Sequence, residues 1–168
     1  RRTRQREAER AVRLLGLSGL EFWNLPDGAV RATTAVVRRL HAVVAQRRPD
    51  LIYAPHEHEA HADHRAAVAG VRRALKLLRK KDKQPEVRLF EVWTPLRRID
   101  HVEDITGQIR EKLAAIRVYK SQCAVVNFVE AFRGLARYRG ELHCWPEGTY
   151  AEVFASLEGG ARPGSRTG

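Results

Sequence analysis

The chain has 168 residues, of which 43% are hydrophobic, and it carries a formal net charge of +11. This length suits one domain with its own core, and the apolar content excludes an intrinsically disordered protein. No apolar run is long enough to cross a membrane, and no segment has the pattern of a secretory signal. The only cysteines are Cys123 and Cys144, which excludes a disulfide framework and favours a cytoplasmic protein.

Most of the positive charge comes from arginine and gathers in two clusters. The clusters are Arg1, Arg2, Arg4, Arg6, Arg10 and Arg13, and then Arg72, Arg73, Lys76, Arg79, Lys80, Lys81 and Lys83. An electrostatic surface for nucleic acid or another polyanion is one interpretation. Two solvated helix faces are the alternative, and neither cluster is interleaved with the aromatic residues that stack bases. We therefore do not expect nucleic acid as a partner.

The first part of the chain predicts two helices separated by a short strand and a turn. Residues 4–15 have the apolar spacing of a helix that ends at Gly16. Residues 20–23 predict a short strand, and Leu25-Pro26-Asp27-Gly28 has the composition of a turn. A threonine at position 33 or 34 is expected to cap a second helix that runs to about residue 46.

Helices and short apolar strands alternate along the rest of the chain. The predicted elements are a strand over 50–55, a helix over 63–80, a polar linker over 81–85, a strand over 87–93, helices over 107–119 and 124–137, and a closing element over 150–157. The alternation indicates an α/β fold with a parallel sheet and crossover helices. We expect a single domain over residues 1–157 and a flexible tail over residues 158–168.

Histidines gather where the predicted strand over 50–55 is followed by the predicted helix over 63–80. They are His56, His58, His61 and His64, and they are accompanied by Glu57, Glu59 and Asp63. Imidazole and carboxylate groups hold divalent metals and transfer protons near neutral pH. The end of a strand and the start of a helix lie at the carboxyl edge of a sheet, where open α/β folds bind ligands. The sequence therefore predicts a functional site here.

Within this group, His61 and His64 lie three residues apart at a predicted helix start, so their side chains share one face. One imidazole of such a pair can hold a metal while the other donates to a developing oxyanion. Asp63 lies in the first helical turn, where a carboxylate suits the helix dipole. A solvent-exposed histidine-rich loop without a role is the alternative that the spacing leaves open.

Several local patterns resemble the PIG-L/LmbE-like de-N-acetylase family and occur in that family's order. They are Arg4…Glu7…Leu15-Gly16, Leu25-Pro26-Asp27-Gly28, Ala54-Pro55-His56 with His61-Ala62-Asp63-His64-Arg65-Ala66-Ala67, Glu91-Val92-Trp93-Thr94-Pro95-Leu96, Asp104-Ile105-Thr106 with Lys112 and Tyr119-Lys120-Ser121-Gln122, and Tyr150-Ala151-Glu152-Val153-Phe154. The stretch that begins at His61 is similar to the family's His-Pro-Asp-His-x-x-Ala motif, with Ala62 in place of proline. The resemblance implies a three-layer, Rossmann-like α/β fold with a mostly parallel sheet.

The resemblance also implies a reaction and roles for particular residues. Members of the family are zinc hydrolases that remove acetyl groups from N-acetylglucosamine-type amino sugars. By resemblance, His64 is a ligand of zinc or another divalent metal, and His61 polarises or protonates the tetrahedral intermediate. Asp63 matches the acidic residue that orients a histidine, while Arg4 and Asp27 match positions that line the sugar pocket. The implied substrate is a small N-acetylated amino sugar or glycoconjugate.

One part of the family's pattern is absent from this chain. The family's first motif, His-Pro-Asp-Asp-Glu on the first strand, supplies two metal ligands and the general base. The chain also contains no methionine, so we expect that it lacks its natural amino terminus and the first strand. Completion of the metal site by His56, His58 or Glu59 is an alternative.

The leading hypothesis is therefore a segment of a metal-dependent amino-sugar de-N-acetylase. A non-catalytic module that binds a polyanion on the same scaffold is a second hypothesis. An inert, unstable fragment is a third.

Overall fold

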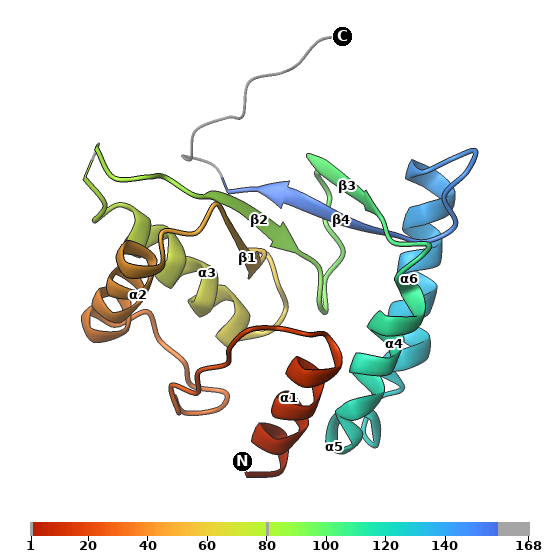
Figure 1. The fold of residues 1–168 in the computed structure, drawn as a ribbon, viewed down its shortest axis with the longest axis horizontal. Coiled ribbons are helices and arrows are strands. Elements are labelled where there is room, and N and C mark those ends of the chain that lie inside the picture. Colours follow the sequence, from red (N-terminus) through yellow and green to blue (C-terminus); the bar gives the residue numbers. More distant parts are fainter. Residues whose placement is uncertain (1, 80, 158–168) are drawn as a thin grey trace, which may run out of the picture. The chain divides into compact units, whose positions relative to one another are not determined.

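The computed structural model describes residues 2–79 and 81–157. In chain order, its elements are α1 (Arg2–Leu14), α2 (Thr34–Arg47), β1 (Leu51–Pro55), α3 (Ala62–Leu75), β2 (Glu86–Phe90), β3 (His101–Asp104), α4 (Ile109–Val118), α5 (Lys120–Cys123), α6 (Phe128–His143) and β4 (Ala151–Ser156) (Figure 1). The predicted mixture of helices and short strands is confirmed. Within the described ranges, no helix has the length and apolar character that a membrane span requires.

The described strands form one open sheet in the order β1-β2-β4-β3. β1 and β2 are parallel, and β2 and β4 are antiparallel, so that Leu89 lies opposite Ala54 on one side and Ala155 on the other. The α/β class is confirmed, but the expectation of a mostly parallel sheet is corrected. Only β1 and β2 are joined by one crossover helix, α3, which returns the chain to the same end of the sheet.

The chain divides into two compact units. The first combines Arg1–Asn24 with Val102–Glu152, and the second combines Leu25–His101 with Val153–Gly168. The single domain over residues 1–157 and the three-layer arrangement stay predictions. The tail predicted over residues 158–168 lies outside the described residues.

In the second unit, α3 packs against β1 and against α2. As predicted, α2 begins after Thr33, whose side chain accepts a hydrogen bond from the N–H of Val36 at 3.3 Å. The core of this unit consists of Ala54, Val68, Val87, Leu89, Ala155 and Leu157. Because side chains alternate along a strand, Val87 and Leu89 both face this core from β2.

The first unit is built from helices, with α1 against α4 and α5 and with α4 against α6. α1 ends before Gly16, as the sequence predicted, and this glycine has a positive φ of 64°. Glu7 of α1 is buried, and its carboxylate accepts hydrogen bonds from the backbone N–H and the hydroxyl of Ser121 at 2.8 and 2.6 Å. The contact between α1 and α5 is therefore partly polar.

Several predicted elements differ from the structure. The strand predicted over 20–23 is wrong, since these residues form no regular element. Asn24, which follows them, accepts a hydrogen bond from the side chain of Gln5 of α1 at 2.9 Å. α3 ends at Leu75 rather than near residue 80. The helix predicted over 124–137 begins at Phe128, because Asn127 caps it by accepting from the N–H of Glu130.

Candidate functional site

The histidine-rich segment lies between β1 and α3 in the second unit. The apolar run of β1 ends at Pro55, and His61 is the N-cap of α3. The segment thus lies at the carboxyl end of a strand and at the start of a helix, as the sequence predicted. Open α/β folds bind ligands at this position.

Glu59 is the most buried side chain of the segment, with 1% of its surface exposed. Its Oε1 accepts hydrogen bonds from three consecutive backbone N–H groups, those of Val92 at 3.1 Å, Trp93 at 2.9 Å and Thr94 at 2.9 Å. These residues directly follow β2. The strand ends at Phe90 rather than at residue 93, because the carboxylate takes the N–H groups that a longer strand would use in the sheet.

Two opposing effects act on the pKa of Glu59. Burial acts to raise the pKa, because water no longer solvates the charged form. The hydrogen bonds from Thr94, His64, Val92 and Trp93 act in the opposite direction and hold the pKa below its ordinary value of 4.5. Glu59 is therefore a carboxylate at neutral pH.

His64 faces this carboxylate, with Nδ1 3.0 Å from Oε2 of Glu59. An ionised carboxylate only accepts hydrogen bonds, so Nδ1 of His64 carries a hydrogen. In the neutral ring, Nε2 then keeps a free lone pair. This is the tautomer that can bind a metal through Nε2.

His61 has the opposite tautomer. Its Nδ1 accepts a hydrogen bond from the backbone N–H of Asp63 at 3.2 Å, as befits an N-cap. Nδ1 therefore has no hydrogen, and in the neutral ring Nε2 carries it. The ring centroids of His61 and His64 lie 4.9 Å apart. The pair thus presents one N–H group and one lone pair from neighbouring rings.

The other histidines of the segment contribute differently. His56 is buried, its Nδ1 accepts from the N–H of His58 at 3.2 Å, and its Nε2 donates to the carbonyl of Thr94 at 2.7 Å. Both nitrogens of His56 and the carboxylate of Glu59 are thus engaged, and His58 is exposed. In the described part of the chain, no three His, Cys, Asp or Glu side chains lie together as a metal site. The alternative in which these residues complete such a site therefore has no support.

Asp63 connects the start of α3 to the Leu25–Gly28 turn. Its Oδ2 accepts from the N–H of Gly28 at 2.7 Å, and its Oδ1 accepts from the N–H of Val30 at 3.0 Å. The carboxylate that contacts His64 is Glu59, which the sequence indicated only as an alternative metal ligand. The role of Asp63 in orienting a histidine stays a prediction.

The two residues expected to line a sugar pocket lie in different units. Asp27 is exposed in the turn that Asp63 holds against α3. Arg4 is exposed on α1, in the first unit. Their roles stay predictions.

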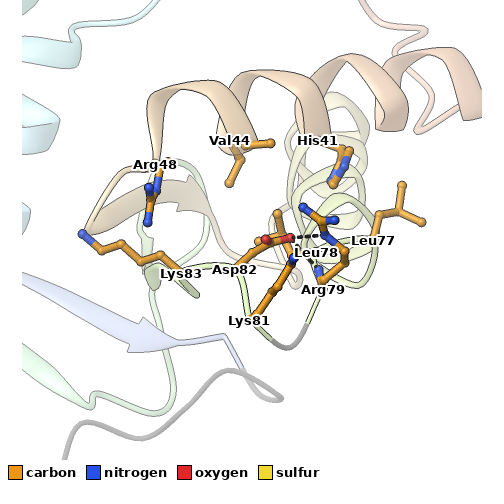
Figure 2. Close-up of a pocket in the computed structure, with 10 residues that line it drawn as sticks. His41, Val44, Arg48, Leu77, Leu78, Arg79, Lys81, Asp82 and Lys83 are labelled. Carbon is orange, nitrogen blue, oxygen red and sulfur yellow. Dashed lines mark hydrogen bonds and ion pairs between the residues drawn. The ribbon is translucent and has the colours of Figure 1, made fainter.

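A separate cavity of about 550 Å³ lies between α2 and the residues that follow α3 (Figure 2). Val44 of α2 and Leu78 form part of its apolar wall. Its cationic side chains are Arg48, Arg79, Lys81 and Lys83. Asp82 accepts from the N–H of Arg79 at 2.8 Å, and Lys83 pairs with Asp50. The cavity shares no lining residue with the histidine-rich segment.

A family model described as PIG-L: GlcNAc-PI de-N-acetylase matches residues 1–75. The predicted resemblance to the PIG-L family is therefore confirmed. The PIG-L match contains β1, the whole histidine-rich segment and α3, and it supports deacetylase activity in general. The comparison with curated proteins finds no match.

Solved structures share the PIG-L/LmbE-like α/β fold over nearly the whole chain. The conserved protein TT1542 from Thermus thermophilus is 28% identical with a TM-score of 0.80, over 92% of this chain and 73% of its own. N,N'-diacetylchitobiose deacetylase from Pyrococcus horikoshii is 23% identical with a TM-score of 0.77, over 92% of this chain and 63% of its own. GalB, the 4-carboxy-2-hydroxymuconate hydratase from Pseudomonas putida KT2440, is 24% identical with a TM-score of 0.83, over 99% of this chain and 75% of its own.

Proposed function

We propose that this chain supplies part of the active site of a metal-dependent amide hydrolase, which removes the acetyl group from an N-acetylglucosamine-type amino sugar. The PIG-L match over residues 1–75 supports this class of reaction. The observation that carries the proposal is the pair of opposite tautomers, in which His64 presents a lone pair and His61 presents an N–H group. A metal hydrolase needs both a ligand and a hydrogen-bond donor to the reacting carbonyl.

His64 is the proposed ligand of zinc or another divalent metal. A histidine whose Nδ1–H donates to a carboxylate is the usual form of a metal-binding histidine. A catalytic zinc takes three protein ligands, and the described residues bring no such group of three together. His64 therefore fits as one ligand, and the other ligands are not among the described side chains. A bound metal would supply water with a lowered pKa and a polarised carbonyl.

His61 is the proposed donor to the substrate. Because its Nδ1 is held by the N–H of Asp63, its Nε2–H is left to donate to the acetyl oxygen as negative charge develops there. Asp63 keeps the start of α3 and the Leu25–Gly28 turn together through Gly28 and Val30. We propose Asp27 and Arg4 as sugar-binding residues by their resemblance to the family.

The test is the release of free amine from a model N-acetylglucosaminide by the zinc-loaded enzyme that contains this chain together with the remaining metal ligands. We expect His61→Ala to lower kcat by roughly 10²–10³-fold, the usual loss for one oxyanion donor. We expect His64→Ala, or a chelator, to abolish turnover. His58→Ala is the matched control, because His58 is exposed in the same segment, and it should keep the activity.

Two outcomes would contradict the proposal. One is turnover that survives both His64→Ala and chelation. The other is the absence of amine release from the unchanged, zinc-loaded enzyme that contains this chain and the remaining metal ligands.

The reaction class needs its own assay, because one structural neighbour is titled a deacetylase and another a hydratase. Both reactions use water as the nucleophile, so the shared fold does not distinguish them. The PIG-L match favours amide hydrolysis. Hydration of an unsaturated 2-hydroxy acid without any amine release would instead favour hydratase chemistry.

A non-catalytic module that binds a polyanion is the second candidate, and the cationic side chains of the cavity in Figure 2 favour it. It predicts retention on heparin that falls steeply with salt and survives His61→Ala and His64→Ala. Arg48→Gln together with Lys81→Gln should weaken that retention. A chain that is not retained at low salt would exclude this candidate.

We also propose a cytoplasmic location. The unpaired state of Cys123 and Cys144 supports it, because lone thiols persist in a reducing compartment.

A further inference from the structure

Glu59 is a buried carboxylate to which the proposed reaction gives no task. We infer that Glu59 is a positioning residue, which holds the imidazole of His64 in a single tautomer so that Nε2 keeps its lone pair. The inference rests on the proposed function only in taking His64 as the metal ligand. The tautomer itself can be measured without any metal.

The carboxylate of Glu59 is held firmly by backbone groups. Its Oε1 accepts from the backbone N–H groups of Val92, Trp93 and Thr94, at distances of 2.9 to 3.1 Å. Backbone donors cannot rotate away as side-chain donors can. Oε1 is therefore fixed by three bonds. Oε2 also accepts from the N–H of Trp93, at 3.2 Å, and faces Nδ1 of His64 at 3.0 Å.

The backbone around Glu59 is held as well. Arg65, the residue after His64, donates from its guanidinium to the carbonyls of Glu59 and Ala60 at 2.5 and 2.6 Å. The N–H of Ala60 donates to the hydroxyl of Thr94 at 3.0 Å. The start of α3 and the segment after β2 thus hold Glu59 from opposite sides. The separation between Glu59 and His64 is fixed by these bonds.

The surroundings of the carboxylate contain donors rather than competing acceptors. Nε2 of His56 lies 3.3 Å from Oε1 of Glu59, and this ring donates to the carbonyl of Thr94 at 2.7 Å. Both Glu59 and His56 are at most 3% exposed, so water does not readily replace these partners. The other neighbours of this buried carboxylate are N–H groups, and the carboxylate itself can only accept hydrogen bonds. Nδ1 of His64 must therefore be the donor.

This arrangement predicts an unusual consequence for Glu59→Gln. A glutamine has one acceptor oxygen, which the three backbone N–H groups of residues 92–94 require. Its amide NH₂ would then replace Oε2, which now accepts from the N–H of Trp93 at 3.2 Å. The NH₂ would face His64, and Nδ1 of His64 would have to accept. The hydrogen of the neutral ring would move to Nε2 and remove the lone pair. A merely structural role for Glu59 predicts no such exchange.

The experiment is nitrogen NMR of the imidazole rings in the metal-free full chain. In the unchanged chain we expect His64 to carry its hydrogen on Nδ1 and His61 to carry it on Nε2. In Glu59→Gln we expect the hydrogen of His64 to move to Nε2. We also expect the affinity for Zn²⁺ to fall roughly 10–100-fold, the usual loss when the partner of a metal-binding histidine is removed.

Glu57→Gln is the matched control. Glu57 lies in the same segment, is exposed, and pairs with Arg72 rather than with a histidine. We expect this variant to keep both tautomers and the affinity for Zn²⁺.

A hydrogen on Nε2 of His64 in the unchanged chain would overturn the inference, and this measurement decides the matter even if Glu59→Gln does not fold. A folded Glu59→Gln chain with an unchanged tautomer and unchanged Zn²⁺ affinity would overturn it too. The expected tautomers without any amine release would leave the role of Glu59 intact and would contradict the proposed function instead.

Discussion

His61 and His64 have the same side chain, and their hydrogen-bond partners give them different chemistry. The Nδ1 of His61 accepts from a backbone N–H at the start of α3, whereas the Nδ1 of His64 donates to the carboxylate of Glu59. One ring is thereby left with an N–H group to donate and the other with a free lone pair. The chemistry of each histidine therefore depends on which of its two ring nitrogens is engaged by its hydrogen-bond partner.

Asp63 provides a prediction at the same scale. The two carboxylate oxygens of Asp63 each accept from one N–H group, that of Gly28 or that of Val30. Asp63→Asn leaves only one acceptor oxygen for these two N–H groups. We expect it to lower the free energy of unfolding by about 1.5–3 kcal/mol, the usual range for a hydrogen bond to a charged group. Urea unfolding measures this change, and hydrogen exchange at Gly28 and Val30 should become faster.

Glu57→Gln is the control for Asp63→Asn, because it removes an exposed charge from the same region. It should change the free energy of unfolding by less than roughly 1 kcal/mol. Unaltered exchange at Gly28 and Val30 in Asp63→Asn would show that these hydrogen bonds are not formed.

The sequence predicted the position of the site but not its internal contacts. His61 and His64 were found because their spacing at a predicted helix start is local. The contact between Glu59 and Val92 spans 33 positions, and the donors are backbone groups, which leave no trace in the pattern of side chains. The partner of His64 could therefore not be deduced from residue types.

At the scale of elements, α6 contains two glycines in contrasting surroundings. A Cβ on Gly140 would lie 2.2 Å from the carbonyl oxygen of Thr149, whereas a Cβ on Gly134 would meet nothing within 4 Å. The clash at Gly140 is with backbone, which cannot turn aside. Gly140 is therefore required for the contact of α6 with the segment before β4.

We predict opposite effects for alanine at these two positions. Gly140→Ala should lower the free energy of unfolding by about 1–3 kcal/mol or more, as overpacking does. Gly134→Ala should raise it by about 0.5–1 kcal/mol, because alanine favours the helix. Denaturant unfolding of the two variants measures both changes. Stabilisation by both substitutions would contradict the close approach at Gly140.

Helices were predicted better than strands, and the reasons are physical. Caps such as Thr33 are local and could be predicted, and the structure confirms this one. β3 (His101–Asp104) was not predicted, because it is an edge strand with polar residues and lacks the apolar run of a covered strand. β2 was predicted too long, since Glu59 takes the N–H groups after Phe90.

At the scale of the whole molecule, alternating helices and strands were enough to predict the α/β class. They were not enough to predict strand direction, because β2 and β4 are separated by β3 and three helices. After such a long connection, the local sequence pattern does not specify at which end of the sheet the next strand begins. The correction from a mostly parallel sheet to a single parallel pair, β1 with β2, has this cause.

Several carboxylates make the stability of the molecule depend on pH. Their pKa values lie below the ordinary values of 4.5 for glutamate and 3.8 for aspartate; they are Glu7, Asp50, Glu59, Asp82 and Asp104. The folded chain binds these protons less tightly than the unfolded chain. The stabilisation is therefore complete above the ordinary pKa values and is lost as the pH falls through the lowered ones.

We predict that the free energy of unfolding falls as the pH is lowered below about 4.5, the ordinary value for glutamate. Urea unfolding at a series of pH values checks this. Ser121→Ala should weaken the acid dependence, because it removes the hydroxyl hydrogen bond that is the largest cause of the lowered pKa of Glu7. A free energy of unfolding that rises on acidification would contradict the assignment of these carboxylates.

The central claim is that Nε2 of His64 is a metal ligand, and the most direct test is to find which ring nitrogen a divalent metal contacts. Titration of the full chain with Zn²⁺, followed by nitrogen NMR of the imidazole rings, measures this. We predict that Nε2 of His64 shifts while its Nδ1 keeps the hydrogen that it donates to Glu59. No change at His64 in saturating zinc, or zinc bound through Nδ1, would contradict the account.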